Sequence, residues 1–221
     1  MRMRKKKHLD ERLAACSRVD LGWIPDGVHE AGISAVRNPA EIFGNDNPVH
    51  LEIGCGKGRF ANTIAAREPG INFLAVEMSP NVAVMAMEQT VNEGLTNLRY
   101  FLGKADYLRN VLPPDSVRRI YLNFSCPYPK SRYTKHRLTS PAFLALYREL
   151  LVSGGDIIQK TDNEGFFAYS LETLGENGFE LRYVTRDLHN SSTEGNIITE
   201  YEQRFLSQGL PIYYLEAVNR K

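Results

Sequence analysis

The chain has 221 residues, of which 43% are hydrophobic and 24% charged, and its formal net charge is +1. This length suits one α/β domain, and the composition excludes a disordered or fibrous protein. No apolar run reaches the roughly 18–20 residues that cross a bilayer, and the three cysteines show neither disulfide nor zinc-ligand spacing, so we expect no membrane segment and no metal.

Residues 1–42 come first and lack a regular apolar period. They begin with Arg2, Arg4 and a run of lysines at positions 5–7. No apolar stretch follows this basic start, so it does not read as a signal peptide. We expect a basic, partly ordered N-terminal arm and, from the odd number of cysteines, a reduced cytoplasmic protein.

Short apolar runs alternate with amphipathic segments from residue 49 onward, which predicts one domain, residues 43–221, built of βα units. Strands are expected at residues 49–53, 71–77, 98–102, 120–124, 156–161, 179–185 and 212–218. One helix is expected between residue 58 and residue 67, and others at residues 79–93, 141–152, 164–175 and 199–207. This order predicts a Rossmann-like α/β fold, with a mostly parallel seven-stranded sheet, an antiparallel last strand and helices on both faces.

Two connections, residues 125–139 and 186–198, are longer than such a fold needs. Long connections in a compact domain are usually functional or disordered. Both follow strands, so we expect them at the carboxyl edge of the sheet, where open α/β sheets bind their ligands.

A glycine-rich loop follows the first of these strands, with Gly54, Gly56 and Gly58 after Glu52. A dinucleotide fingerprint would need a glycine at position 59, where the chain has Arg59. An acid just before the glycines suits a cationic ligand and repels a diphosphate. The pattern therefore indicates S-adenosylmethionine as the cofactor and a class I methyltransferase fold.

Further candidate cofactor residues lie at or just after the ends of the next strands. Glu77 is placed to accept hydrogen bonds from the ribose hydroxyls, Asp106 to meet the adenine amine, and Asn123 to contact cofactor or substrate. A single acid at a strand end is commonplace on a protein surface, and Asn123 is equally a turn former. Only the combination of acid, glycines and second acid in one βαβ frame favours this cofactor.

Several segments resemble those of the bacterial tRNA (guanine-N7)-methyltransferases, which methylate guanine 46 in the variable loop of tRNA. The resemblance covers nearly the whole chain from residue 43 onward. Besides the glycine loop, it rests on segments 43–48 (Phe-Gly-Asn-Asp-Asn-Pro), 121–124 (Tyr-Leu-Asn-Phe, then Pro-x-Pro-Lys), 160–163 (Lys-Thr-Asp-Asn), 187–191 (Asp-Leu-His-Asn-Ser) and 199–202 (Thr-Glu-Tyr-Glu).

The resemblance implies that Glu52, Glu77 and Asp106 bind the cofactor and that tRNA is the partner. The residues that it implies for the substrate guanosine are Lys130, Asp162, Thr199, Glu200, Tyr201 and Glu202. Neither the resemblance nor the sequence pattern distinguishes a monomer from a homodimer.

A basic cluster without acids lies inside the connection 125–139. It consists of Lys130, Arg132, Lys135 and Arg137. Charge runs are often only solvated surface. This one is interleaved with Tyr128 and Tyr133, a composition that suits phosphate contact and base stacking. We therefore expect Arg132, Lys135 and Arg137 to contact the RNA backbone.

Position 126 departs from the family pattern, because Cys126 stands where the family has the aspartate of an Asp-Pro-Trp-Pro run. We place Asp162 and Cys126 at the catalytic centre, although a thiol cannot accept the hydrogen bonds that a carboxylate accepts. Three accounts stay open. Catalysis rests on Asp162 with Glu200 and Glu202 while Cys126 is a tolerated variant, or the substrate has shifted, or the chain binds RNA without catalysing.

Overall fold

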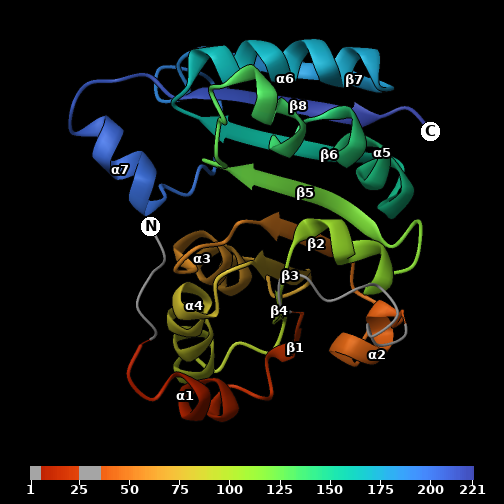
Figure 1. Ribbon diagram of the computed structural model, residues 1–221, viewed down its shortest axis with the longest axis vertical. Helices are drawn as coiled ribbons and strands as arrows, with labels where there is room; N and C mark the ends of the chain where they lie inside the picture. Colours follow the sequence, from red (N-terminus) through yellow and green to blue (C-terminus); the bar gives the residue numbers. More distant parts are fainter. Residues whose placement is uncertain (1–5, 25–35) are drawn as a thin grey trace. The chain divides into compact units, whose positions relative to one another are not determined.

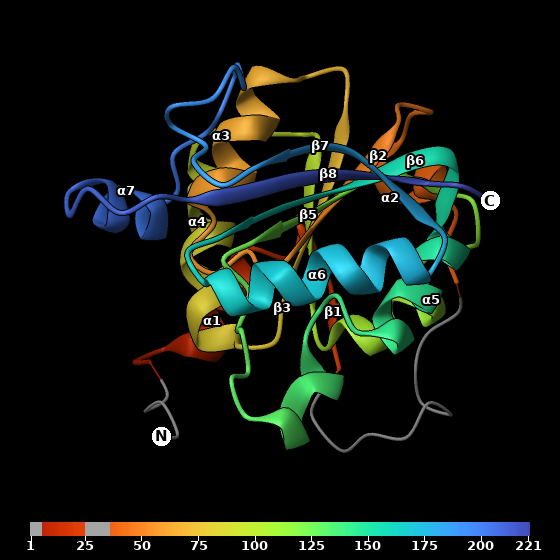
Figure 2. The same cartoon turned by 90° about the horizontal axis from the view of Figure 1, so that it is seen from above.

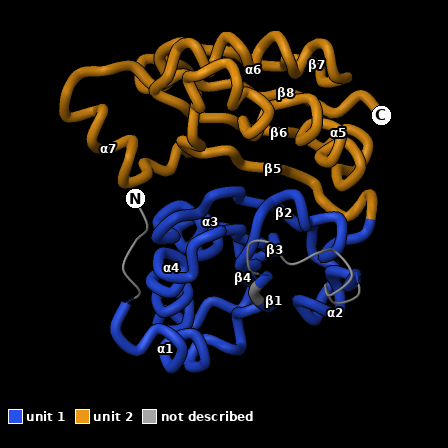
Figure 3. The backbone as a smooth tube through the Cα atoms, viewed as in Figure 1, with its two compact units in different colours: residues 1–113 blue, residues 114–221 orange. Residues whose placement is uncertain are grey.

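A computed structural model describes residues 6–24 and 36–221. The basic residues Arg2, Arg4 and Lys5 lie outside this part of the chain. The backbone groups into two compact units, Met1–Pro113 and Pro114–Lys221 (Figure 3). The expected division into an arm of residues 1–42 and one domain of residues 43–221 stays a prediction.

Unit 1 contains four parallel strands in the order β1-β4-β3-β2 (Figure 1). The strands are β1 (Asp20–Trp23), β2 (Val49–Ile53), β3 (Asn72–Glu77) and β4 (Leu98–Leu102). The helices are α1 (Leu9–Ala15), α2 (Pro39–Phe43), α3 (Arg59–Arg67), α4 (Pro80–Asn92) and the 3₁₀ helix η2 (Ala105–Asn110). Every residue of β2 is buried, as expected for a strand of a parallel sheet with both faces covered.

Unit 2 contains four further strands in the order β5-β6-β8-β7. The strands are β5 (Val117–Asn123), β6 (Leu151–Thr161), β7 (Phe179–Thr185) and β8 (Tyr213–Asn219). The helices are the 3₁₀ helix η3 (Ser131–His136), α5 (Pro141–Leu150), α6 (Glu164–Glu176) and α7 (Glu200–Leu206). The helices α5 and α6 pack along one face of these strands, whereas α7 lies off their end (Figure 2).

The predicted strand directions are confirmed. The strands β5 and β6 are parallel, and β8 runs antiparallel to both β6 and β7. The prediction of seven strands was one too low for the described part of the chain, because β1 comes from the segment expected to be an arm and pairs with β4. The strand β6 also begins at Leu151 rather than at the expected residue 156, directly after α5 ends at Leu150.

Candidate functional site

The glycine loop joins β2 to α3 in unit 1. Gly54, Gly56 and Gly58 all have positive φ angles, of 85°, 59° and 84°. This left-handed region costs a residue with a Cβ roughly 1–2 kcal/mol, so glycine is the residue that fits. The backbone N–H groups of Gly54 and Cys55 both donate to the carbonyl oxygen of Val76, at 2.8 and 3.1 Å. The loop is thereby fixed against the end of β3.

Glu77 ends β3 and helps to shape the glycine loop. Its Oε2 accepts a hydrogen bond from the Gly56 N–H at 3.1 Å, and its Oε1 accepts one from the Ser79 N–H at 2.9 Å. The same carboxylate thus connects the loop to the start of α4. Glu52 is buried in β2, one strand away. Asp106 is exposed in η2, just after β4.

These three acids belong to one edge of the sheet in unit 1. The register pairs Glu52 with Ala75, and Glu77 with Leu102. Since β2, β3 and β4 are adjacent and parallel, their carboxyl ends meet at one edge. Three acids beside a loop of glycines suit a ligand with a positive charge and hydroxyl donors. Their assignment to the cofactor stays a prediction.

Cys55 lies inside the glycine loop and is buried. Burial, and then the charges of Glu52 and Glu77, raises the pKa of the Cys55 thiol well above its ordinary value of 9.0. The thiol therefore stays protonated near neutral pH and is no nucleophile. Its role is that of a small apolar side chain.

A buried polar network holds the last residue of the loop. The Asn62 amide nitrogen donates to the carbonyl oxygen of Gly58 at 3.0 Å and to the Tyr100 hydroxyl at 3.2 Å. The Thr90 hydroxyl donates to the Asn62 amide oxygen at 2.7 Å. All three side chains are fully buried. The network joins α3, α4 and β4, and sequence reasoning missed it because none of its members belongs to a recognisable motif.

In unit 2 the candidate residues follow the ends of β5 and β6. The register pairs Asn123 with Lys160, and the Phe124 N–H donates to the Lys160 carbonyl oxygen at 2.8 Å. Asn123 is buried, whereas Asp162 is exposed in the turn between β6 and α6. Phe124 has a φ of 51°, which is strained for a bulky residue and is typical of functional sites.

The connection 125–139 contains the expected basic cluster, part of it in η3. Lys130, Arg132 and Lys135 are exposed, as contacts with RNA phosphates require. Arg137 is half-buried, and its guanidinium donates to the carbonyl oxygens of Pro127 at 2.8 Å and Tyr128 at 3.1 Å. It also lies 4.4 Å from the ring centroid of Tyr169 in α6.

Arg137 thus anchors the segment that carries Cys126, and its expected contact with RNA stays a prediction. Cys126 itself is exposed. The ring of Tyr133 is exposed beneath the Arg132 guanidinium, 4.8 Å from its centroid.

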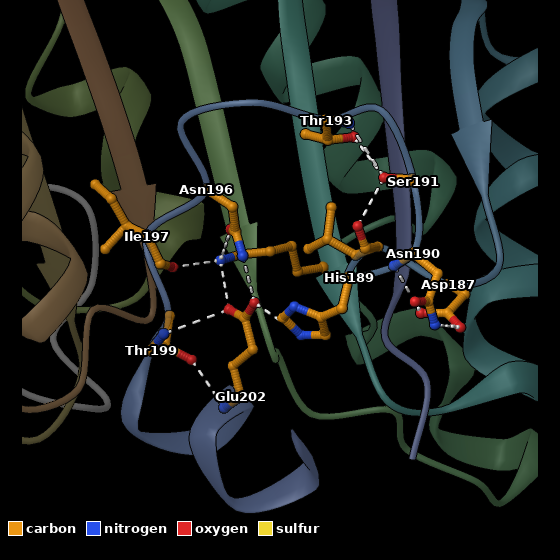
Figure 4. Close-up of polar contacts among 11 residues, drawn as sticks. Asp187, His189, Asn190, Ser191, Thr193, Asn196, Ile197, Thr199 and Glu202 are labelled. Carbon is orange, nitrogen blue, oxygen red and sulfur yellow. Dashed lines mark hydrogen bonds and ion pairs between the residues drawn. The ribbon is translucent and has the colours of Figure 1, made fainter. Parts of the chain in front are cut away.

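A buried ion pair lies where the second long connection meets α7 (Figure 4). The Lys160 ammonium is 2.8 Å from Glu202 Oε2, and the two side chains are 3% and 0% exposed. Thr199 and Glu202 form a capping box at the start of α7, in which each satisfies a backbone N–H group of the other. The Glu202 carboxylate is therefore occupied by groups of the protein, and its expected contact with guanosine stays a prediction.

Three aromatic rings stack beside this pair. The Phe124 and Tyr201 ring centroids are 6.1 Å apart at an interplanar angle of 24°. Phe205 lies 6.4 Å from each of the other two rings. Tyr201 is 59% exposed. Together with Glu200, it presents a flat ring and a carboxylate on the exposed first turn of α7.

Sequence reasoning missed Lys160, Asn196 and Phe205 as members of this site. Lys160 carried a usable signal, because a lysine in a strand buried on both sides needs partners.

In the part of the chain that the structure describes, no three His, Cys, Asp or Glu side chains are grouped to hold a metal ion. The described helices include none that is long and apolar enough to cross a membrane.

Known proteins resemble the chain over most of its length. A family model described as putative methyltransferase matches residues 46–215. The tRNA (guanine-N(7)-)-methyltransferase of Listeria monocytogenes serotype 4b (strain F2365) is 45% identical over 202 residues, which are 88% of this chain and 94% of that protein. The enzyme of the same name from Geobacillus sp. (strain WCH70) is 44% identical over 216 residues, covering 98% and 94% of the two chains.

Solved structures resemble the fold at low sequence identity. The 16S rRNA methyltransferase KamB aligns with a TM-score of 0.61 and 14% identity, covering 85% of this chain and 99% of that one. A SAM-dependent methyltransferase from Aquifex aeolicus aligns with a TM-score of 0.56 and 13% identity, covering 79% and 84%. These similarities confirm the predicted class I, Rossmann-like α/β fold.

Proposed function

The chain belongs to the tRNA (guanine-N(7)-)-methyltransferase family, and from this membership we propose that it transfers a methyl group from S-adenosylmethionine to N7 of a guanine in tRNA. The observation that carries the proposal is the identity of 45% over 88% of the chain. Glu52, the glycine loop and Glu77 lie within the matched family region, residues 46–215.

The chemistry of this transfer asks little of the protein beyond positioning. Guanine N7 carries an in-plane lone pair, so no base is needed to create the nucleophile. The lone pair attacks the methyl carbon as its bond to the sulfonium sulfur breaks, and the positive charge moves from sulfur to the guanine ring. The protein aligns the two reactants and stabilises the charge that arrives on the base.

Unit 1 supplies the cofactor-binding residues in this proposal. The buried carboxylate of Glu52 favours the cationic end of S-adenosylmethionine, Glu77 accepts from the ribose hydroxyls and Asp106 from the adenine amine. The left-handed backbone at Gly54, Gly56 and Gly58 lets the ligand approach the main chain closely.

Unit 2 supplies the guanine-binding residues. Guanine N1–H and N2–H₂ are donors, and the exposed carboxylates of Asp162 and Glu200 match them. Tyr201 offers an exposed ring on which a base can stack. Lys130 and Thr199 complete the set that we assign to the guanosine.

The RNA is the variable-loop region of tRNA, with guanine 46 as the acceptor. A guanine held in tertiary contacts must leave its stack before methyl transfer. Arg132 and Lys135 are exposed in η3, where phosphates can reach them. The cytoplasm, where tRNA is processed in bacteria, is the corresponding location, and both a monomer and a homodimer are compatible with these roles.

Cys126 raises the one competing proposal, a relative that binds tRNA without methylating it or that methylates another RNA. The direct experiment incubates the protein with unmodified tRNA and isotopically labelled S-adenosylmethionine and identifies the nucleosides by mass spectrometry. We expect labelled 7-methylguanosine, and none when guanine 46 is replaced by adenine. Binding of cofactor and tRNA without this product would contradict the proposal and favour a protein that binds tRNA without methylating it.

A further inference from the structure

The helix α7 is attached to unit 2 in an unusual way. It has seven residues, and Glu202 is its one buried residue. A helix this short is not stable alone in water, and most helices in proteins are held by a packed apolar face. In α7 the buried contact is instead made by a carboxylate, which pairs with Lys160 at the end of β6 (Figure 4).

Lys160 bonds to the connection 186–198 as well as to the helix α7. Besides Glu202, its ammonium donates to the Asn196 amide oxygen at 3.1 Å and to the Ile197 carbonyl oxygen at 2.9 Å. An ammonium has three hydrogens to donate, so these three acceptors match its full capacity. Through one side chain, β6 therefore holds residues 196, 197 and 202.

Glu202 is bonded in the same convergent manner. Its Oε2 also accepts from the Thr199 N–H at 3.3 Å, and its Oε1 accepts from the Asn196 amide nitrogen at 2.5 Å. His189 Nε2 lies 3.3 Å from Oε1, close enough for an ion pair when the imidazole is protonated, although it makes no hydrogen bond there. The segments 160–163, 187–191 and 199–202, which are far apart in the sequence, thus meet at the Glu202 carboxylate.

A buried ion pair is a poor device for stability alone, because the loss of hydration offsets much of the attraction and an apolar pair often does as well. What the pair supplies is a fixed orientation of the helix, since each hydrogen bond has a required geometry. The residues whose orientation depends on α7 are Glu200 and Tyr201, which are exposed on its first turn. The Tyr201 ring stacks on Phe124, whose N–H donates to the backbone of Lys160 itself.

We propose that Lys160 is a positioning residue, whose pair with Glu202 orients α7 so that Glu200 and Tyr201 meet the guanine of the tRNA. This inference rests on the proposed function for its substrate, and it assigns Glu202 to the orientation of α7. Lys160 touches neither reactant in this role. Its effect is on the binding of tRNA and leaves the binding of S-adenosylmethionine unchanged.

The test compares Lys160→Met with Arg119→Met in the full chain. Arg119 in β5 pairs with Asp156 in β6 at 2.6 Å; Asp156 is buried, Arg119 is 32% exposed, and neither hydrogen bond of this pair involves α7. We expect Lys160→Met to raise KM for tRNA at least about tenfold, equivalent to about 1.4 kcal/mol, with the affinity for S-adenosylmethionine unchanged. Arg119→Met should lower thermal stability and leave KM for tRNA near that of the parent protein.

Hydrogen exchange gives a second readout that does not depend on methylation. We expect the amides of residues 199–206 to lose protection in Lys160→Met and to keep it in Arg119→Met. Unchanged protection together with unchanged KM in the folded Lys160→Met variant would overturn the inference. If the parent protein fails to methylate tRNA while this exchange pattern appears, the proposed function fails and the positioning role of Lys160 stands.

A double variant, Lys160→Met with Glu202→Leu, addresses the risk that an unpaired buried charge prevents folding. It removes both charges, so the apolar pair is expected to fold. The raised KM should persist, because an apolar contact does not direct α7. Recovery of the parent KM in the double variant would show that the pair only stabilises the fold and would overturn the inference.

Discussion

A Cβ atom on Gly58 would lie 2.4 Å from the Cβ of Ala86 and 2.8 Å from the amide nitrogen of Asn62. The end of the glycine loop and the helix α4 therefore approach each other at a distance that only glycine permits. Gly58 is also the residue before α3 and has a φ of 84°. The close approach and the backbone conformation require the same residue.

Gly58→Ala should consequently lower stability by about 2–4 kcal/mol, from the left-handed backbone and the overpacking together. It should also weaken the binding of S-adenosylmethionine, since the loop cannot keep its shape. Urea unfolding and titration calorimetry measure the two effects. Gly70→Ala is the matched control, because a Cβ there meets nothing within 4 Å. Equal stability of the two variants would contradict the steric account.

Variants at Lys135 and Arg137 should distinguish two roles within the basic cluster, electrostatic attraction of RNA by Lys135 and anchoring of the segment by Arg137. Lys135 is exposed, so Lys135→Ala should leave stability unchanged and reduce the slope of log K against log salt for tRNA binding by about 0.7–0.9. Arg137 bonds the carbonyl oxygens of Pro127 and Tyr128. Arg137→Ala should therefore lower stability by about 1.5–3 kcal/mol, the range for hydrogen bonds with a charged partner.

The measurements for this pair are tRNA binding at several salt concentrations and urea unfolding. A loss of salt dependence in Arg137→Ala without a loss of stability would mean that Arg137 contacts phosphate and does not anchor the segment.

The sequence was most informative where function depends on a local pattern. A strand, a glycine loop and a helix follow one another within a few residues, so the loop at residues 54–58 was predicted correctly. The strand β1 was missed for the opposite reason. Asp20–Trp23 is a short edge strand containing a glycine with a φ of 114°, and only its pairing with β4, far along the chain, makes it a strand.

In the candidate site, too, features set by a local pattern were predictable, whereas those set by contacts far along the chain were not. The segment 199–202 was recognised from its sequence, and a Thr-x-x-Glu spacing is also the signature of a capping box. Whether Glu202 faces solvent or the interior depends on Lys160, which is 42 residues away along the chain. No local pattern contains that information, and so the burial of Glu202 could only be found in the folded structure.

Cys126→Ser tests whether the thiol takes part in methyl transfer. Guanine N7 needs neither a base nor a covalent intermediate, so we expect the single-turnover rate to fall by less than about tenfold, whereas loss of an acid–base group typically costs about 10²-fold or more. Cys126→Asp restores the carboxylate of the family and should raise the rate. A serine variant without activity would show that the thiol is required.

Asp162→Asn tests the carboxylate that we assign to the guanine. An amide still fits the turn after β6 but presents a donor where guanine also has donors, so kcat/KM for tRNA should fall by about 10–100-fold, as for a lost hydrogen bond with a charged group. Glu164→Gln is the control, because Glu164 is also exposed and pairs with Arg186 at 3.1 Å. Equal losses in the two variants would contradict a specific role for Asp162.

The pair of Arg119 and Asp156 predicts how stability depends on pH. Burial alone raises the pKa of the Asp156 carboxyl, but the hydrogen bonds and charges of Arg119 and Arg182 outweigh it and hold that pKa below its ordinary value of 3.8. A carboxyl with a lowered pKa in the folded state contributes stability that is fully present above the unfolded-state value. That contribution is lost as the pH falls through the folded-state pKa.

Arg119→Met removes the largest of the opposing contributions, so burial should then raise the Asp156 pKa and move acid unfolding to a higher pH. Asp156→Asn cannot titrate. It should cost about 1.5–3 kcal/mol at pH 7, the range for hydrogen bonds with a charged partner, since the partly exposed Arg119 loses its carboxylate. It should also flatten the dependence of stability on pH below about pH 4, near the ordinary pKa of aspartate. Urea unfolding at pH 7, 5, 4 and 3 measures both. An unchanged acid midpoint in Arg119→Met would show that this pair does not govern the pH dependence of stability.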